Sequence, residues 1–140
     1  MNTPEFIEGG KYSDVRGNLF FNNEFNTSEI KRIYCIENTE TDFIRGWTGH
    51  KIEQRWFSAV LGSFTIKLVK INDWEAPSRE LEILEYELNA EKLDVLHIPS
   101  GYASAIQANE KGAKLLVMAN YSLGEIDDEY RFPIDYFENL

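Results

Sequence analysis

The sequence predicts an all-β fold, a sandwich or a barrel with little helix. No segment carries a long apolar stripe with the 3.6-residue period of an amphipathic helix. Roughly eight short apolar segments follow one another at short spacing, and turn residues separate them. Short strands in regular succession are typical of all-β architectures, whereas longer helical segments between strands would indicate a parallel sheet.

Composition bounds the size of the fold and its partners. A chain of 140 residues with 43% hydrophobic residues is long enough for one sizeable core, so we expect a single domain over residues 1–140. The formal net charge of −10 argues against a nucleic-acid surface and against docking to anionic lipid. Small molecules or proteins are therefore the expected partners, with no nucleic acid and no membrane.

The ends of the chain and its cysteine content indicate the compartment. The start, MNTPEFIEGG, has no basic segment followed by an apolar one, and no later run reaches the ~18 apolar residues of a membrane span. We expect a cytoplasmic protein. Cys35 is the only cysteine, so no internal disulfide or cysteine-rich metal site can form, and we expect it to be a small core residue.

The first third of the chain contains a turn and two predicted strands. Asp14 and Gly17 in SDVRGN supply turn chemistry, and a strand is expected to begin at Leu19 to Phe21. In IKRIYCI, residues 30–36, apolar side chains fall on both faces. This pattern predicts either a strand buried on both sides or an inner barrel strand with Arg32 and Tyr34 pointing into a polar mouth.

The remaining strands are bounded by turn residues. SFTIKLVKI alternates with Phe64, Ile66 and Leu68 on one face, and the junction at Gly62 before it predicts a hairpin. EILEYELN predicts a strand with one solvated face, DVLHIPSGYASAIQ a strand interrupted by a Pro-x-Gly turn, and AKLLVMANYSL a last strand. The acidic clusters, which include Asp127 to Glu129, are expected to be solvated, and the aromatic tail to be a short helix or an arm over the barrel.

Residues 45–62, RGWTGHKIEQRWFSAVLG, carry the most informative spacing. In a cupin barrel the pattern HxH, four residues, Glu, six residues, Gly places two imidazoles and a carboxylate on one metal. The same positions here hold Thr48, His50, Arg55 and Gly62. The second cupin signature, Pro-x-Gly-x-x-His, is matched in spacing by Pro99, Gly101 and Ser104.

Three of the four ligand positions have thus lost their ligand. A threonine coordinates poorly, and an arginine is cationic at any working pH and cannot coordinate. The sequence therefore predicts a cupin barrel, a double-stranded β-helix or jelly roll, with no metal and no other cofactor.

Four short motifs carry a resemblance to a known family. DVRGNL, IKRIYCI, RGWTGHK and LGSFTIKLV stand in the same order as D-x-R-G, I-K-R-x-Y-x-I, R-G-x-H-A-H-K and G-S. That series resembles the dTDP-4-keto-6-deoxyhexose 3,4-ketoisomerases, which are WxcM-like members of the RmlC-like cupins. YRFPIDYF is similar to their tyrosine-rich C-terminus, and IPSGYASAI resembles more weakly the dTDP-4-dehydrorhamnose 3,5-epimerases.

The resemblance implies a metal-independent, dimeric cupin that acts on a thymidine-diphosphate sugar. It further implies that the first histidine of H-A-H, here Thr48, is the family's proton shuttle, whereas the second is retained as His50. The epimerase histidine of the second motif is replaced by Ser104.

The retained residues suit proton transfer next to a ketone. Moving a carbonyl between neighbouring carbons needs a base with a pKa near neutrality and a donor for the oxyanion. His50 is the base candidate, its alternative being a structural histidine at a strand end. Tyr102 and Tyr34 are candidates for the acid or the hydrogen-bond donor, whereas His97 is expected in the core or on a dimer face.

Cations and one aromatic residue are candidates for holding the substrate. The residues considered for the diphosphate are Arg45, Arg16, Arg32 and Lys51, because an acidic protein must concentrate positive charge locally to bind such an anion. Arg55 is expected to point into the barrel, where a bound anion or a partner carboxylate must offset its charge. Trp47 is either a core residue or a surface on which a base or sugar stacks.

Two functions from different classes follow from these residues. The first is a sugar-nucleotide isomerase or epimerase that relies on His50 and a tyrosine. The second is a non-catalytic cupin that binds a nucleotide sugar or another anionic sugar. The lost histidines favour the second, the retained Arg45, His50 and Lys51 favour the first, and we favour the enzyme.

Overall fold

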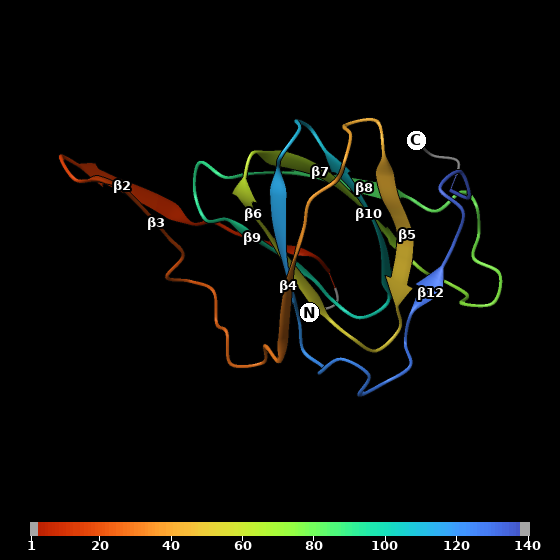
Figure 1. The fold of residues 1–140 in the computed structure, drawn as a ribbon. Helices are drawn as coiled ribbons and strands as arrows, with labels where there is room; N and C mark the ends of the chain where they lie inside the picture. The colour runs from red at the N-terminus through yellow and green to blue at the C-terminus, as the bar shows by residue number, and fades with distance from the viewer. Residues whose placement is uncertain (1–2, 138–140) are drawn as a thin grey trace.

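The structure, a computed structural model, describes residues 3–137 as two packed antiparallel sheets with no helix among them. One sheet has the order β1 (Glu5–Ile7), β9 (Val95–Ile98), β6 (Arg55–Leu61), β11 (Lys114–Ala119), β4 (Arg32–Ile36). The other has the order β12 (Tyr130–Arg131), β5 (Ile44–His50), β10 (Tyr102–Ala108), β7 (Ser63–Lys70), β8 (Ile83–Asn89). The two sheets face each other around the interior (Figure 1), which confirms the all-β prediction.

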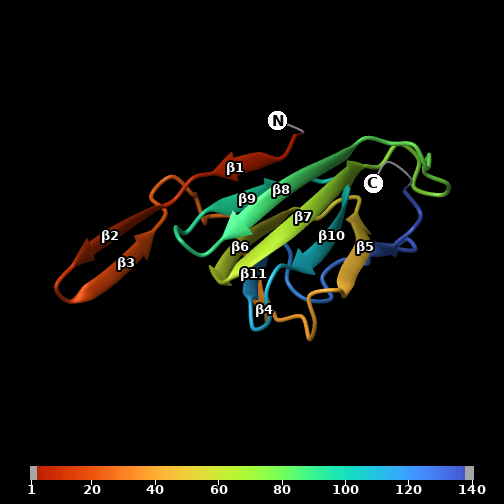
Figure 2. The same ribbon diagram turned by 90° about the horizontal axis from the view of Figure 1, so that it is seen from above.

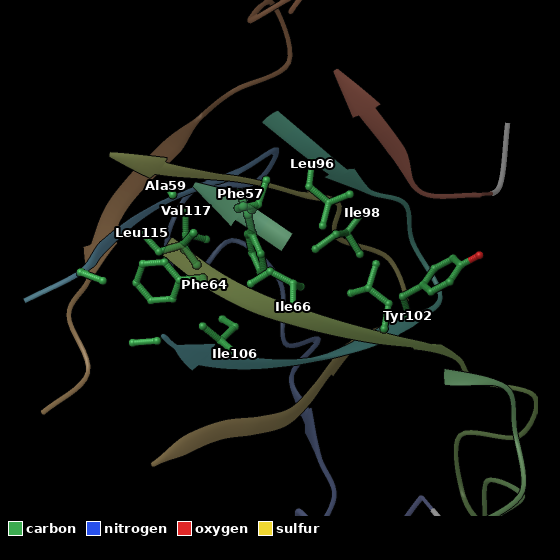
Figure 3. Packing of buried hydrophobic residues seen from close by; sticks show 14 residues of the cluster. Phe57, Ala59, Phe64, Ile66, Leu96, Ile98, Tyr102, Ile106, Leu115 and Val117 are labelled. Atoms are coloured by element: carbon green, nitrogen blue, oxygen red, sulfur yellow. The ribbon is translucent and has the colours of Figure 1, made fainter. Parts of the chain in front are cut away.

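The core lies between the inner faces of the two sheets. Phe64, Ile66 and Leu68 of β7 alternate inward and are fully buried, as their period of two predicts. Phe57 of β6 and Val117 of β11 meet them from the opposite sheet (Figure 3). These long-range contacts join strands distant in the sequence, so neither sheet buries its inner face without the other.

The predicted hairpin at Gly62 is wrong. β6 pairs with β9 and β11, whereas β7 pairs with β8 and β10, so the chain changes sheets at Gly62. Gly62 has φ 72°, and a Cβ there would lie 2.8 Å from the Cβ of Ala113. The positive φ of the glycine allows the chain to turn a corner between the two layers, not to form a hairpin within one sheet.

The predicted strand over residues 30–36 is β4, an edge strand with one inner face. Arg32, Tyr34 and Ile36 are half-buried, whereas Ile33 and Cys35 are exposed. Arg32 and Tyr34 share the inner face, as the second alternative predicts, but β4 is an edge strand and not the inner strand expected. The expectation that Cys35 lies in the core is wrong. Edge position explains the difference, because nothing in the described chain covers the outer face of β4 at this residue.

The C-terminal segment is an arm, not a helix. β12 pairs with β5, with Tyr130 opposite Gly49 and Arg131 opposite Thr48. Further along, the ring of Phe137 is buried against Trp47 in an edge-on contact, with 5.1 Å between centroids. The arm thus covers the outer face of β5 and brings residues of the tail to the strand that carries His50.

A separate hairpin extends from the two sheets. β2 (Gly10–Asp14) pairs with β3 (Gly17–Phe21), with Asp14 opposite Gly17 beside the predicted turn. Figures 1 and 2 show this hairpin reaching away from the barrel in both views. Leu19 and Phe20 on it are 57% and 44% exposed. No helix in the described part of the chain could cross a membrane.

Candidate active site

A cavity of about 700 Å³ opens between the two sheets, above the apolar core. The cavity is lined by residues of β4 and β6 on one side and of β5, β10 and β12 on the other. Its four residues that stand at the metal-ligand positions of the cupin pattern are Thr48, His50, Arg55 and Ser104. The geometry of the cupin frame is therefore kept, and its positions converge on one space.

The chemistry of these four residues does not fit a divalent cation. They provide two neutral hydroxyls, one imidazole and a guanidinium that cannot coordinate. Across residues 3–137, no group of three or more histidine, cysteine or acidic side chains is placed to hold a metal. The cavity instead presents a titratable imidazole beside fixed positive charges.

His50 is buried at the end of β5, with only 8% of its surface exposed. Its Nδ1 lies 3.1 Å from the main-chain carbonyl oxygen of Asp128. A carbonyl can only accept, so Nδ1 carries the hydrogen and Nε2 keeps its lone pair. His50 also lines a second, smaller cavity of about 120 Å³. The unprotonated Nε2 makes His50 chemically suited to accept a proton.

The surroundings of His50 keep its ring neutral. Burial lowers the pKa of His50 below its ordinary value of 6.5, and the charge of Arg55 lowers it further. Glu53, 3.6 Å from Nδ1, and the hydrogen bond to Asp128 act in the opposite direction on this pKa. Since burial and the charge of Arg55 prevail, the imidazole is a neutral base at pH 7.

Arg55 has a partner carboxylate, one of the two partners predicted for it. Its guanidinium forms an ion pair with Glu53, in which Nε donates over 2.7 Å, and both side chains are about nine-tenths buried. Its Nη1 donates to the hydroxyl of Tyr34 over 2.7 Å. Because that hydroxyl accepts from Arg55, its own hydrogen remains available for donation.

A β-bulge directs Arg45 into the cavity. Thr48 lies opposite Ser104 and Arg45 opposite Ile106, so two residues of β5 face the single Ala105 of β10. The extra residue reverses the alternation, and Arg45 joins Thr48 and His50 among the lining residues. Its Nε donates to Oδ1 of the buried Asn38 over 2.8 Å, which orients the guanidinium.

Three of the candidate substrate-binding residues lie away from the cavity. Trp47 faces the opposite side of β5, packs on Phe137 and is 1% exposed, so it is a core residue and offers no stacking surface. Lys51 is exposed in the turn after β5. Arg16 lies at the end of the β2–β3 hairpin, paired with Asp14 and 84% exposed in its side chain.

Arg32 lies next to the cavity but not in it. It lines the smaller cavity beside His50, and its guanidinium lies 4.6 Å from the centre of the Tyr34 ring. A cation over the face of a tyrosine ring helps to hold the ring in place.

Tyr102 does not reach the cavity either. It lies opposite His50 in the pairing of β10 and β5, but its ring belongs to the apolar cluster (Figure 3). Burial and the neighbouring Tyr86 raise the pKa of Tyr102. Of the two candidate tyrosines, the structure brings only Tyr34 to the cavity.

His97 lies on β9, in the sheet that also contains β4 and β6, and it does not line the cavity. It stacks on Trp56 with 4.9 Å between ring centroids, and its Nε2 lies 2.6 Å from Oε1 of Gln54. His97 is half-buried, so of its two predicted positions it is not fully in the core, and the dimer face stays a prediction.

Several site residues escaped the sequence analysis. Glu53, Glu129 and Arg131 were not selected, and Asp128 was assigned to a solvated acidic cluster although it is 6% exposed. Glu53 had a readable signal, because it is a carboxylate between His50 and Arg55 in HKIEQR. Asp128 had none, since its neighbours Asp127 and Glu129 are acidic and exposed.

Comparison with known proteins identifies a sequence family that matches nearly the whole chain. The sequence model of the FdtA family, described as WxcM-like, C-terminal, matches residues 2–138. No curated protein matches the chain.

Solved structures give the same result. A variant of the 3,4-ketoisomerase QdtA from Thermoanaerobacterium thermosaccharolyticum, in complex with TDP-4-keto-6-deoxyglucose, is 26% identical with a TM-score of 0.72; the match covers 98% of this chain and 93% of that one. A 3,4-ketoisomerase from Helicobacter canadensis is also 26% identical, with a TM-score of 0.71 and coverage of 96% and 94%.

A more distant structure shows the fold alone. The RmlC epimerase of Mycobacterium tuberculosis is 13% identical, with a TM-score of 0.71 and coverage of 92% and 68%. The predicted RmlC-like cupin fold is thereby confirmed.

The burial of His50 predicts a loss of stability in acid. Its pKa is lower in the folded than in the unfolded protein, so its contribution is complete above 6.5 and is lost as the pH falls through the folded value. The free energy of unfolding of the wild type should therefore fall more between about pH 7.5 and about pH 5.5 than that of His50→Asn, measured by urea denaturation. His97 is common to both proteins and cancels in the comparison. An equal fall in both would contradict the assignment.

Proposed function

Since the chain belongs to the WxcM-like, C-terminal family (FdtA), as its motifs indicated, we propose that it is a metal-independent nucleotide-sugar isomerase acting on a dTDP-4-keto-6-deoxyhexose. The observation that carries this proposal is the buried, neutral His50 with an unprotonated Nε2 in a cavity that also holds Arg45 and Arg55. The relatives at 26% identity are sugar 3,4-ketoisomerases, and one of them is a complex with TDP-4-keto-6-deoxyglucose.

In the proposed reaction His50 removes the proton on C3, which is acidic because C3 is adjacent to the C4 ketone. The electrons of the C–H bond form an enediol double bond, and the C4 oxygen becomes an oxyanion. The proton of the C3 hydroxyl then passes to the C4 oxyanion, and protonated His50 delivers its proton to C4, which completes the shift of the carbonyl from C4 to C3. The base is regenerated, and no oxidant or reductant is required.

Tyr34 and Arg55 are assigned to the developing oxyanion. The Tyr34 hydroxyl accepts from Arg55 and can donate onward, so the guanidinium makes the phenol a better donor. A preoriented donor of this kind in a site shielded from water stabilises an enediolate more than bulk solvent does. The hydroxyls of Thr48 and Ser104, which line the cavity opposite each other on β5 and β10, are assigned to contacts with the sugar ring.

Arg45 and Arg131 are assigned to the diphosphate. Both line the cavity, and both are oriented by a hydrogen bond from Nε, to Asn38 and to Glu129 respectively. Oriented guanidinium groups match phosphate oxygens in pairs, and they concentrate positive charge in a chain whose net charge is −10.

A non-catalytic sugar-nucleotide binder is the second candidate. The observation that favours it is that Thr48 and Ser104 stand at two positions where the cupin pattern has histidines. Such a protein would use the same cavity and the same arginines, but no proton would move.

We expect His50 to be required for turnover. Incubation with dTDP-4-keto-6-deoxyglucose in deuterated water should yield the 3-keto sugar, with deuterium at a ring carbon, both followed by NMR. His50→Asn keeps the size of the side chain but cannot accept the proton, so turnover should fall by ~10²–10⁴ with little change in affinity. If wild type gives neither product nor deuterium while it binds the sugar nucleotide, the protein is a binder.

Replacing Arg45 should weaken substrate binding. Arg45→Lys retains the charge but removes the planar pair of donors, so the affinity for thymidine diphosphate, measured by calorimetry, should fall by about 10- to 100-fold. Lys114→Ala, which removes an exposed cation at the start of β11, is the control and should leave affinity unchanged. Equal affinities for wild type and Arg45→Lys would exclude Arg45 from the diphosphate site.

We also expect a homodimer formed through the β2–β3 hairpin. A two-stranded hairpin standing free is marginally stable, and exposed Leu19 and Phe20 would invite uncontrolled pairing. The wild type should therefore be a dimer at micromolar concentration in light scattering, and Leu19→Ser with Phe20→Ser should shift it to monomer. Leu123→Ser, at a residue 80% exposed elsewhere, is the control. A monomeric wild type would contradict the prediction.

A further inference from the structure

Asp128 is a buried acidic residue for which the proposed reaction provides no role. It stands between the exposed Asp127 and Glu129 in the acidic tail, yet it is only 6% exposed. Burial of a carboxylate is costly unless hydrogen bonds replace its water. The contacts that offset this cost all lead to the segment that follows His50.

The carboxylate of Asp128 holds the turn between β5 and β6. Its Oδ1 accepts the main-chain N–H of Lys51 over 3.0 Å, and its Oδ2 accepts those of Ile52 and Glu53 over 2.9 and 2.7 Å. Three consecutive amides converging on one carboxylate form a compact anion site. This turn joins His50 to Arg55, and it carries Glu53, the ion-pair partner of Arg55.

The main chain of the same residue contacts the imidazole. The carbonyl oxygen of Asp128 lies 3.1 Å from Nδ1 of His50. The side chain of Asp128 therefore binds the turn at residues 51–53, and its carbonyl binds the neighbouring ring of His50. Movement of the turn relative to the tail would break both sets of contacts at once.

We propose that Asp128 is a positioning residue of the active site, which holds His50 in the Nδ1–H tautomer through its carbonyl and fixes the Glu53 turn through its carboxylate. This role rests on the proposed function of His50 as the base. Without the carbonyl, either ring nitrogen can carry the hydrogen, and in the other tautomer Nε2 has no lone pair for the substrate.

Charged and titratable groups approach His50 from every neighbouring element. They are Arg32 on β4, Arg55 on β6, Glu53 in the turn, Tyr102 on β10, and Asp128 and Glu129 in the tail. Removing the negative charge of Asp128 leaves the positive charge of Arg55 less opposed at His50, so the pKa of His50 falls further. A neutral variant should therefore show the acidic limb of kcat/KM at lower pH, and the tautomer of His50 distinguishes a positioning role from a purely structural anchor.

Asp128→Asn and Asp127→Asn form a matched pair. Each removes one negative charge from the same segment, but only the first touches the turn and His50. We call the three hydrogen bonds from the turn to the Asp128 carboxylate, together with the contact of its carbonyl with His50, the clamp. In Asp128→Asn the amide nitrogen must face at least one of the three main-chain N–H groups, so the clamp loses at least one hydrogen bond.

Nitrogen-15 NMR of the histidine rings at about pH 8 tests the clamp without substrate, above the ordinary histidine pKa. The chain has 2 histidines, and in wild type His50 should be in the Nδ1–H form and His97 in the Nε2–H form that its contact with Gln54 favours. His50 should become a mixture of tautomers in Asp128→Asn and stay unchanged in Asp127→Asn. The His97 signal reports whether each variant is folded.

Turnover gives the second readout. Asp128→Asn should lower kcat by about 10- to 100-fold with little change in KM, as expected when a catalytic group is misplaced, and Asp127→Asn should change neither. If Asp128→Asn does not fold, Asp128→Glu takes its place, because its longer side chain keeps the charge and displaces the clamp. A single unchanged Nδ1–H form of His50 in the folded variant would overturn the proposal.

The NMR result separates this proposal from the proposed function. A clamp confirmed by NMR in a protein that leaves the sugar unchanged would mean that the isomerase assignment fails while the positioning of His50 stands. A wild type that turns over with His50 in the Nε2–H form would refute the clamp and leave the isomerase assignment in place.

Discussion

The arrangement of the site depends on the burial of a guanidinium at a position where the cupin pattern has a carboxylate. Arg55 is about nine-tenths buried, so its charge needs a partner, and removing the partner of such a pair costs about 3–5 kcal/mol. Glu53 meets this need from only two residues away, which requires a tight turn before β6. The main-chain N–H groups of this turn need hydrogen-bond acceptors, and the carboxylate oxygens of Asp128 provide them.

The need for Asp128 at the turn makes the C-terminal arm part of the site. Asp128 can reach the turn because β12 pairs with β5 and Phe137 packs on Trp47. Aromatic burial on the outer face of the sheet thus positions a carboxylate at the smaller cavity that His50 also lines. The C-terminal arm is for this reason part of the active-site architecture, although none of its residues belongs to the cupin signatures.

How far the sequence predicts this protein can be judged from particular residues. The alternation in β7 and the positions of Thr48, His50, Arg55 and Ser104 were predicted correctly, because side-chain period and motif spacing are local properties. Gly62 was taken for a hairpin and Cys35 for a core residue, since the sheet to which a strand belongs depends on its distant partners. Tyr34 and Tyr102 were equivalent candidates in the sequence, and only packing separates them.

The sequence by itself determined the class of fold, the loss of the metal ligands and the family, because each rests on residue types at fixed spacing along one segment. The tertiary structure alone decided which nitrogen of His50 is free and that a bulge turns Arg45 inward. These features arise from contacts between residues as far as 78 positions apart. Such contacts are chosen by the packing of the two sheets and the tail, and no local pattern encodes them.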